Sequence, residues 1–439
     1  MELALWMFPA LFVAIFIGVP VAFALLGVSL VFGFIRFGDA AVHQFIAEVQ
    51  DLASNYVLAA VPLFILMGTL LESTGIAKQL FKAVHMWTRR LPGSLAVSTI
   101  LLGTVFAAAS GVVGATETVI GLLAIPVMLS HNYSKSLISG TVCGGGSLGT
   151  AIPPSVVVIV LAPSADVSVG SLFAAILFPG LMMAGLFILY IIVHATLDPR
   201  VAPRSLPDED DDGMSLLGKL RFTLVAFLPP VLLIFSVLGT ILLGWATPTE
   251  AAACGALGTL LLTATMGQFK LAVFWNAIKR SLLISVMILT ILLGGHIFSG
   301  IFAASGGVSA TREILDAANL SPWSIILLIL LIGFIGGFIL DLVSVVLIVI
   351  PLAIPIVNAL GFDTIWFLVL FLIVLQTGYL TPPMAPSIFY LRSISPPEML
   401  LKHMYRGVIP FIGMQLVTLV LVMAFPELAL WLPEYIRGP

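Results

Sequence analysis

Apolar runs long enough to cross a lipid bilayer recur from one end of this chain of 439 residues to the other. Runs of about 18 or more mostly apolar residues are the pattern of transmembrane helices. Hydrophobic residues make up 60% of the chain and charged residues only 9%. The clearest runs are Phe12 to Phe34, Leu172 to Val193, Phe222 to Leu243, Leu282 to Ile301 and Gly407 to Phe425. We therefore predict an all-α membrane protein that crosses the bilayer many times and is surrounded by membrane lipid.

The charges and the N-terminus exclude some alternatives. The net charge is -3, and no block of Lys and Arg alternates with aromatic residues, so we expect no nucleic-acid partner. The first apolar run lacks the basic segment and the cleavage site of a signal peptide, so we interpret it as a retained membrane segment. Gly18 and Pro20 interrupt it, and it fits either one tilted span or two short ones.

The Lys and Arg residues predict which side of the membrane each loop faces, because cytoplasmic loops carry an excess of both. Segments 73–93, 196–222, 269–280 and 392–407, with the bend at Lys135, contain all but three of the 18 positive residues; the exceptions are Arg36, Arg312 and Arg437. This sorting requires the run 95–129 to enter and leave on the cytoplasmic side, and the run 324–360 to enter and leave on the opposite side. Both are therefore predicted to be re-entrant hairpins; the alternative is one or two ordinary spans in each.

The segment 196–222 is the only markedly polar linker. Its acidic run, Asp208 to Asp212, lacks the spaced ligands and the glycine turn of a calcium-binding loop, so we interpret it as a solvated loop. We take this linker as the divider between two halves of the chain.

Two segments interrupted by glycine and proline recur, one in each half. They are GGSLGTAIPPS (Gly145–Ser155) and QTGYLTPPMAP (Gln376–Pro386). Placing Gly149 on Gly378 superposes the two Pro-Pro pairs and aligns Ala124-Ile125-Pro126 with Ala353-Ile354-Pro355. An odd number of predicted spans separates the two hairpins, so the halves must be inverted repeats. Inverted repeats with interrupted segments predict a secondary transporter whose site lies near the middle of the bilayer.

Non-helical backbone is tolerated inside a membrane only where it lines a cavity or binds something. We expect the glycines of 145–152 to turn their carbonyl groups away from the helix axis, and Pro153 and Pro154 to restart a helix. Carbonyl and hydroxyl oxygens suit a cation such as sodium, whereas helix N-termini favour an anion. Substrate contacts are predicted from the hydroxyls of the hairpin tips and broken segments: Thr116, Ser147, Thr150, Ser344 and Thr377.

Two carboxylates lie at the predicted tips, and acidic groups within apolar runs are commonly functional. Asp341 fits a cation ligand, a proton carrier or a structural cap; Glu117 fits a ligand or a helix cap. We expect His296 to make a structural hydrogen bond to a neighbouring helix. Apart from Arg392 near one end, no Lys or Arg is expected near a tip or a break, so an anion would depend on sodium, helix dipoles and hydroxyls.

Several motifs, taken in order, resemble the large membrane subunit of tripartite ATP-independent periplasmic (TRAP) transporters, often called the M or DctM-like subunit. The motifs are FAAASGVVGAT (106–116), GSLGTAIPPS (146–155), ATPTEAAA (246–253), the tip at Asp341 and TGYLTPPMAPS (377–387). The resemblance covers essentially the whole chain.

The resemblance implies an elevator-type, sodium-coupled importer of a small organic acid anion in the bacterial inner membrane. It also implies a small four-helix membrane subunit and a periplasmic substrate-binding protein as partners. By analogy, about two sodium ions or more would bind, one between the first tip and break and one between the second tip and break. The first set is Ser110, Gly111, Gly149, Pro153 and Ser155; the second is Gly337, Asp341, Gly378, Thr381 and, through its backbone, Met384.

The predicted division of the chain follows from these features. Segment 1–93 holds scaffold spans and a basic cytoplasmic arm, 94–164 the first transport half, 165–280 scaffold spans with the linker, 281–407 the second transport half, and 408–439 a C-terminal span. Three alternatives to a tripartite transporter are a self-sufficient sodium/dicarboxylate symporter, a channel, and an intramembrane enzyme that uses Ser110 and His296.

Overall fold

The computed structural model describes residues 2–111, 113–203, 215–267 and 269–437, and these residues form helices and no strand. Eight of their helices are long and apolar enough to cross a membrane. The prediction of an all-α polytopic membrane protein is confirmed. The acidic run Asp208–Asp212 lies outside the described residues.

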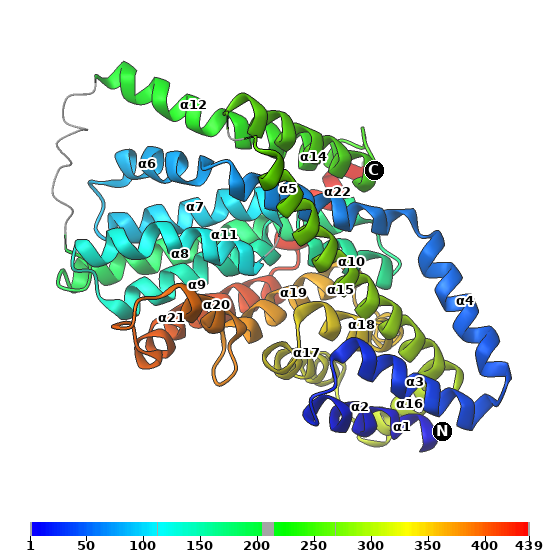
Figure 1. Ribbon diagram of the computed structural model, residues 1–439. Helices are drawn as coiled ribbons and strands as arrows, with labels where there is room; N and C mark the ends of the chain where they lie inside the picture. Colours follow the sequence, from blue (N-terminus) through cyan, green and yellow to red (C-terminus); the bar gives the residue numbers. More distant parts are fainter. Residues whose placement is uncertain (1, 112, 204–214, 268, 438–439) are drawn as a thin grey trace.

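The N-terminal run forms two helices rather than one tilted span. The chain reverses between them at Gly18, whose φ of +100° favours glycine. The first helices are α1 (Glu2–Leu5), α2 (Met7–Phe16), α3 (Val21–Phe37) and α4 (Ala40–Ser54). Figure 1 shows α4 at the edge of the molecule, where it packs on α3 and α15.

The remaining helices follow in two series. Up to the predicted divider they are η1 (Tyr56–Ala59), α5 (Ala60–Ser73), α6 (Ile76–Thr88), α7 (Ser94–Ser110), α8 (Val113–Ser130), α9 (Lys135–Ala151), α10 (Val156–Ser164) and α11 (Val169–Leu197). Beyond it they are α12 (Leu216–Ile234), η2 (Phe235–Gly239), α13 (Thr240–Leu242), α14 (Pro248–Thr265), α15 (Leu271–Ala304), α16 (Gly307–Ala317), α17 (Pro322–Ile339), α18 (Leu342–Ala359), α19 (Thr364–Leu380), α20 (Pro386–Ile394), α21 (Leu401–Ala424) and α22 (Glu427–Arg437).

Both predicted hairpins are pairs of packed helices. Hairpin 1 consists of α7 and α8, and its first arm ends at Gly111 in the left-handed conformation, with a φ of +64°. Hairpin 2 consists of α17 and α18, which meet at Leu340 and Asp341. The two interrupted segments are broken helices, α9 followed by α10 and α19 followed by α20.

The position of the first break differs from the prediction. The glycines of 145–149 lie inside α9, and the helix breaks only at residues 152–155, which contain both prolines. These glycines allow close helix packing instead. A Cβ at Gly146 would lie 1.8 Å from Cγ of Glu117, and one at Gly144 would lie 2.5 Å from the Phe411 ring. The backbone of α9 stays helical through these glycines. Their lack of a side chain allows close approach of neighbouring helices, and their conformational freedom is not used.

The hairpins and broken helices interlock in a crossed pattern. In each half, the first hairpin arm packs on the first part of that half's own broken helix: α7 on α9, and α17 on α19. The second arm also packs on its own broken helix, α8 on α9 and α18 on α19, and in addition contacts the last part of the other one: α8 on α20, and α18 on α10. We call these elements, together with α11 and α21, the interlocked body. Figure 1 shows α7, α8, α9 and α11 side by side in the centre of the molecule.

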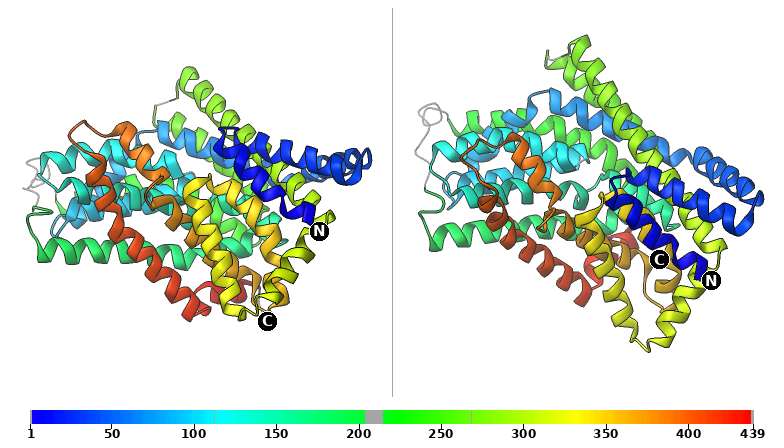
Figure 2. Two further views of the ribbon diagram at one scale, coloured as in Figure 1. Left: turned by 90° about the horizontal axis from the view of Figure 1, so that it is seen from below. Right: turned by 60° about the horizontal axis from the view of Figure 1, so that its bottom comes forward.

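Helices α3, α5, α14 and α15 form a second group, here called the outer frame. Within it, α5 packs on α14 and α15, and α15 packs on α3. The predicted division placed α11 with the scaffold spans, but α11 packs on α7, α9, α19 and α21, so the packing assigns it to the body. Figure 2 shows α1 to α4 on a different side of the molecule from α21.

Large apolar side chains on the outer surface are suited to lipid. On α12, for example, Leu224, Val225, Leu228 and Leu232 are all exposed. A continuous apolar outer face of this size fits a bilayer rather than water.

Candidate functional site

The first hairpin tip and the first helix break are in direct contact. The carbonyl oxygen of Gly111 accepts a hydrogen bond of 3.2 Å from the backbone N–H of Val156, the first residue of α10. A Cβ at Gly111 would lie 2.7 Å from the carbonyl oxygen of Pro154. The structure therefore brings together Gly111 and the Pro153–Ser155 segment, as the sequence predicted.

Hydroxyl groups surround this first junction. Ser110 and Thr116 share a hydrogen bond of 2.7 Å between their side-chain oxygens, which ties the two arms of hairpin 1 together. Ser155 is fully buried, and its hydroxyl oxygen has no hydrogen-bond partner among the described residues. A buried hydroxyl without a partner costs free energy unless something else binds it. Gly149 lies one turn before the break, inside α9.

The second tip meets the second broken helix through two glycines. A Cβ at Gly337 would lie 3.2 Å from the carbonyl oxygen of Leu375, and one at Gly378 would lie 2.8 Å from the carbonyl oxygen of Phe334. Asp341 is the N-cap of α18: it accepts a 3.0 Å hydrogen bond from the backbone N–H of Ser344 and a further one from the Ser344 hydroxyl. The structure thus gives Asp341 the geometry of a cap, and any cation binding there remains a prediction.

Three other predicted residues lie along this second broken helix. Thr377 donates to the carbonyl of Ile373, and Thr381, the C-cap of α19, donates to the carbonyl of Thr377. Met384 is exposed within the break. The hydroxyl of Tyr405, on α21, donates to the carbonyl of Pro383 at 3.4 Å.

Two glutamines of the body were missed by the sequence analysis. Ser147 accepts hydrogen bonds from the amide nitrogens of Gln376 (3.2 Å) and Gln415 (3.5 Å), and it donates to the carbonyl of Gly144. Thr150 donates to the carbonyl of Ser147. Ser147 and Thr150 are therefore buried where α9, α19 and α21 cross, and their hydroxyls are engaged within the body.

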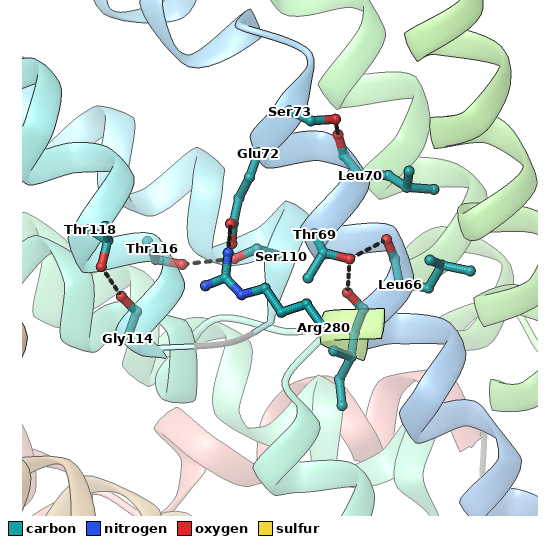
Figure 3. A network of polar contacts seen from close by, with 11 residues as sticks. Leu66, Thr69, Leu70, Glu72, Ser73, Ser110, Gly114, Thr116, Thr118 and Arg280 are labelled. Carbon is teal, nitrogen blue, oxygen red and sulfur yellow. Dashed lines mark hydrogen bonds and ion pairs between the residues drawn. The ribbon is translucent and has the colours of Figure 1, made fainter. Parts of the chain in front are cut away.

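A small cavity of about 190 Å³ lies between the outer frame and the body. Glu72 and Thr69 of α5 and Arg280 of α15 line it from the frame, and Gly114 and Thr118 of hairpin 1 line it from the body, with Tyr390 of α20 beside them. Figure 3 shows Arg280 reaching toward Glu72 next to the tip residues, and the two side chains form an ion pair with an N–O distance of 2.8 Å. The expectation that no Lys or Arg lies near a tip was wrong, because Arg280 of α15 lines the same cavity as Gly114 and Thr118 of hairpin 1.

The described residues of this cavity include none of the five predicted substrate contacts. The second carboxylate oxygen of Glu72 is buried and has no hydrogen-bond partner among the described residues. The cavity therefore presents a guanidinium group, a carboxylate oxygen and two threonines to whatever enters it. Arg392, the cation that was expected near one end, instead donates to the carbonyl of Met399.

Glu117 is neither exposed nor a helix cap. Its side chain is 0% exposed and accepts hydrogen bonds from the hydroxyls of Ser387 (2.6 Å) and Tyr379 (3.3 Å). It therefore joins hairpin 1 to both parts of the second broken helix.

The enzyme alternative receives no geometric support. The hydroxyl of Ser110 is bonded to Thr116, while His296 lies on α15 near Asp51 of α4. A nucleophile needs its base within hydrogen-bond reach, and Ser110 and His296 form no hydrogen bond with each other and have different neighbours.

Comparisons with known proteins agree on one family. Residues 8–428 match the family described as "Tripartite ATP-independent periplasmic transporter, DctM component". The chain is similar to the C4-dicarboxylate TRAP transporter large permease protein DctM of Vibrio cholerae, with 27% identity over 96% of each chain. It is also similar to the sialic acid TRAP transporter large permease protein SiaM of Vibrio cholerae, with 28% identity over 97% of each chain. A third relative is the ectoine TRAP transporter large permease protein TeaC of Halomonas elongata, with 27% identity over 95% of this chain and 96% of that one.

One solved structure has a similar fold. The Alcanivorax borkumensis YdaH transporter superposes with a TM-score of 0.64 over 92% of this chain and 97% of that one, at 15% sequence identity. This likeness concerns the fold alone. Because the family match covers nearly the whole described chain and its apolar helices fit the same architecture, this protein belongs to the DctM component family of TRAP transporters and is a multi-pass protein of the inner membrane.

Proposed function

We propose that this chain imports a small organic acid anion across the inner membrane, driven by sodium, as the large membrane subunit of a tripartite transporter. A periplasmic binding protein would deliver the substrate, and a small four-helix subunit would complete the membrane part. The relatives' names mention C4-dicarboxylate, sialic acid and ectoine, which supports a small carboxylate as substrate here.

The observation that carries the proposal is the junction between the first tip and the first break. There, Gly111 packs against Pro154 and Ser155, and the buried hydroxyl of Ser155 has no hydrogen-bond partner among the described residues. Oxygen ligands from unwound backbone are the usual way that such transporters hold a sodium ion. The residues therefore fit a sodium site, with Gly149 and Pro153 as further members of the set, and a bound ion would supply positive charge close to the substrate.

The second junction is proposed as the matching site, with Gly337, Asp341, Gly378, Thr381 and Met384 as its members. Asp341 would serve both as the cap of α18 and as an anionic ligand. The helix N-termini of α18 and α20 favour negative charge nearby. Hydroxyls of Thr116, Ser344 and Thr377 remain candidates for contacts to substrate.

The packing supports an elevator movement. Hairpin 1 rests on α5 at Gly68, where a Cβ would lie 2.8 Å from the Ser110 carbonyl oxygen, and hairpin 2 rests on α15 through α18. The body contains both junctions, so moving it against the outer frame would carry them together. The cavity at Arg280 would then bind the substrate on the cytoplasmic side, because the Arg280 guanidinium can pair with a carboxylate of the substrate.

The test is uptake of labelled organic acids into proteoliposomes under an inward sodium gradient. Uptake is expected only when this chain, the small subunit and the binding protein are all present together with sodium. Uptake by this chain alone would identify it instead as a self-sufficient symporter, and uptake without sodium would remove the sodium assignment.

The Asp341→Ala variant adds a control for lost capping. Asp363 is also an N-cap, of α19, and accepts a 2.8 Å hydrogen bond from the backbone N–H of Trp366. Both Asp341→Ala and Asp363→Ala lose one cap, worth about 1 kcal/mol, so we expect similar thermal stability. Only Asp341→Ala should abolish uptake; equal loss in both variants would reduce Asp341 to a structural role.

A further inference from the structure

Glu117 accepts hydrogen bonds from neutral donors and forms no ion pair among the described residues. Its titratable neighbours are Tyr379 on α19, Tyr390 on α20 and Cys143 on α9, and these phenol groups and this thiol are neutral at neutral pH. The glycine at position 146 leaves no space on the α9 side, since a Cβ there would overlap Glu117.

The nearest elements direct their charged groups elsewhere. Arg392 of α20 bonds to Met399, Lys135 of α9 pairs with Glu398, and Arg280 pairs with Glu72. No Lys, Arg or His of the described residues forms an ion pair with Glu117. An ionised carboxylate buried without a partner of opposite charge would cost many kcal/mol, so such groups are neutralised.

We propose that Glu117 is a proton-binding site of this transporter, neutral in the packed state, whose proton joins hairpin 1 to the second broken helix. The geometry allows this directly. The Ser387 hydroxyl donates to Oε1, at 2.6 Å, and a proton on Oε2 would reverse the 3.3 Å hydrogen bond that Oε2 otherwise accepts from the Tyr379 hydroxyl. Loss of the proton would leave a bare negative charge between α8, α9 and α20 and would favour separation of hairpin 1 from α20.

A cavity also lies close to Glu117 along α8. Thr118, the next residue of α8, lines the cavity at Arg280, and the ring of Tyr390 covers Gly114 at the cavity wall. Water in that cavity is thus separated from Glu117 by side chains that lie between hairpin 1 and α20. Opening this contact would let the proton exchange.

The first test is infrared spectroscopy of the purified full-length chain at neutral pH, which requires no transport and so is independent of the proposed function. We expect a carbonyl band of a protonated carboxylic acid that is absent from Glu117→Gln but retained in Glu398→Gln, a variant of the partner of Lys135. The proposal would be overturned if Glu117→Gln lost only a band of an ionised carboxylate. It would also be overturned if that band of the native chain shifted when sodium was added.

Ser387→Ala covers the case in which Glu117→Gln does not fold. This variant removes the hydrogen bond of 2.6 Å but leaves Glu117 in place, so the same band should move to higher frequency. A band that does not move would not come from Glu117, which would also overturn the assignment.

The second readout is the pH dependence of uptake in the reconstituted transporter. Above the titration midpoint of one site, the protonated fraction falls about tenfold for each pH unit, and we expect native uptake to fall with it. Glu117→Gln, which cannot ionise, should lose this decline, whereas Glu398→Gln should keep it. If Glu117→Gln and the native chain decline alike, proton binding at Glu117 does not control the packing of hairpin 1.

Discussion

Ser155 is one of five described residues with a buried side-chain oxygen that has no hydrogen-bond partner in the protein. Its hydroxyl makes no capping hydrogen bond, although Ser155 is the N-cap residue of α10 at the first junction. If it binds sodium, Ser155→Ala should lose about 1.5 kcal/mol of binding free energy, equivalent to a roughly tenfold higher sodium concentration for half-maximal uptake.

A matched control for this prediction lies on the same helix. Ser164, at the other end of α10, donates to the carbonyl of Val160, so Ser164→Ala should leave the sodium dependence unchanged. The measurement is uptake as a function of sodium concentration. An unchanged sodium dependence in Ser155→Ala would remove that residue from the site.

The ion pair at the cavity gives a second prediction at the scale of single residues. The Arg280 side chain is 52% exposed and the Glu72 side chain only 12%. Arg280→Gln would therefore leave a mostly buried carboxylate without its partner, at a cost of about 1 to 3 kcal/mol. We expect a lower unfolding temperature than for Lys279→Gln, the neighbouring residue, whose ammonium group lies 5.9 Å from the Trp275 ring centroid.

The double variant Glu72→Gln/Arg280→Gln separates charge from packing. It removes both charges, so it should recover part of the stability lost in Arg280→Gln. If the double variant is as unstable as Arg280→Gln, the loss arises from packing of the Arg280 side chain rather than from the unpaired carboxylate.

Sequence reasoning at this scale located the interruptions of the chain, while the assignment of their residues to a sodium site stays a prediction. Ser110, Gly111 and Ser155 each lie at an interruption that the sequence displays, and the structure brings them to one junction. Arg280 was missed because its position in a basic loop predicted only its side of the membrane, and its contact with hairpin 1 depends on how α15 packs. Gln376 and Gln415 carried a usable signal, since amides within apolar helices need partners.

At the scale of helices, close packing by glycine gives a sharp contrast within α21. A Cβ at Gly407 would lie 2.1 Å from the carbonyl oxygen of Ser136 on α9, whereas a Cβ at Gly413 has no neighbouring atom within 4 Å. Gly407→Ala should destabilise the protein by about 1 to 3 kcal/mol or more, because backbone must move. Gly413→Ala should be neutral or stabilising by up to about 1 kcal/mol.

Thermal unfolding of both variants in detergent checks this contrast. The two substitutions add the same methyl group to the same helix, so differences in helix propensity cancel. Equal unfolding temperatures would mean that α9 and α21 can separate without loss, and that the close approach of Gly407 is not needed for stability.

The same use of glycine explains why one element was misplaced. From the sequence, residues 145–152 were expected to be non-helical, since glycine permits unusual backbone angles. In the structure α9 continues to Ala151, and its glycines receive Glu117 and Phe411 instead. The pairing of two packed helices in each predicted hairpin is confirmed, and their re-entrant course in the membrane stays a prediction; packing against neighbouring helices is not visible in one segment of sequence.

At the scale of the whole molecule, the contacts between the two halves support the proposed inverted repeat. Ser147 and Gln376, which the alignment of Gly149 with Gly378 makes equivalent, are 229 residues apart and hydrogen-bonded to each other. Aligning the starts of α11 and α21 likewise makes Met183 equivalent to Gln415. Each of these two residues contacts one member of the Ser147–Gln376 pair: Met183 accepts a hydrogen bond from Gln376, and Gln415 donates one to Ser147. Equivalent residues of two repeats can meet only near the axis that relates them, so an axis would pass through this cluster.

If the body moves as a unit, joining it to the outer frame should stop transport. Thr118 of hairpin 1 and Met287 of α15 line the same cavity, so Thr118→Cys/Met287→Cys can be linked by a short bifunctional maleimide. Cys254 is exposed and is first replaced by serine; Cys143 is buried. We expect uptake to fall to background in the fraction of protein that is linked, because hairpin 1 can then no longer slide along α5 and α15.

The control links two elements of the body to each other. Leu122 of α8 and Ser395, which follows α20, line another cavity, and linking Leu122→Cys/Ser395→Cys should leave uptake unchanged if α8 and α20 travel together. If the cross-linked Thr118→Cys/Met287→Cys variant took up substrate at the native rate, movement of hairpin 1 against α15 would be excluded. Loss of uptake in both linked variants would instead mean that hairpin 1 must separate from α20 in each cycle, and the moving unit would then be the hairpin rather than the whole body.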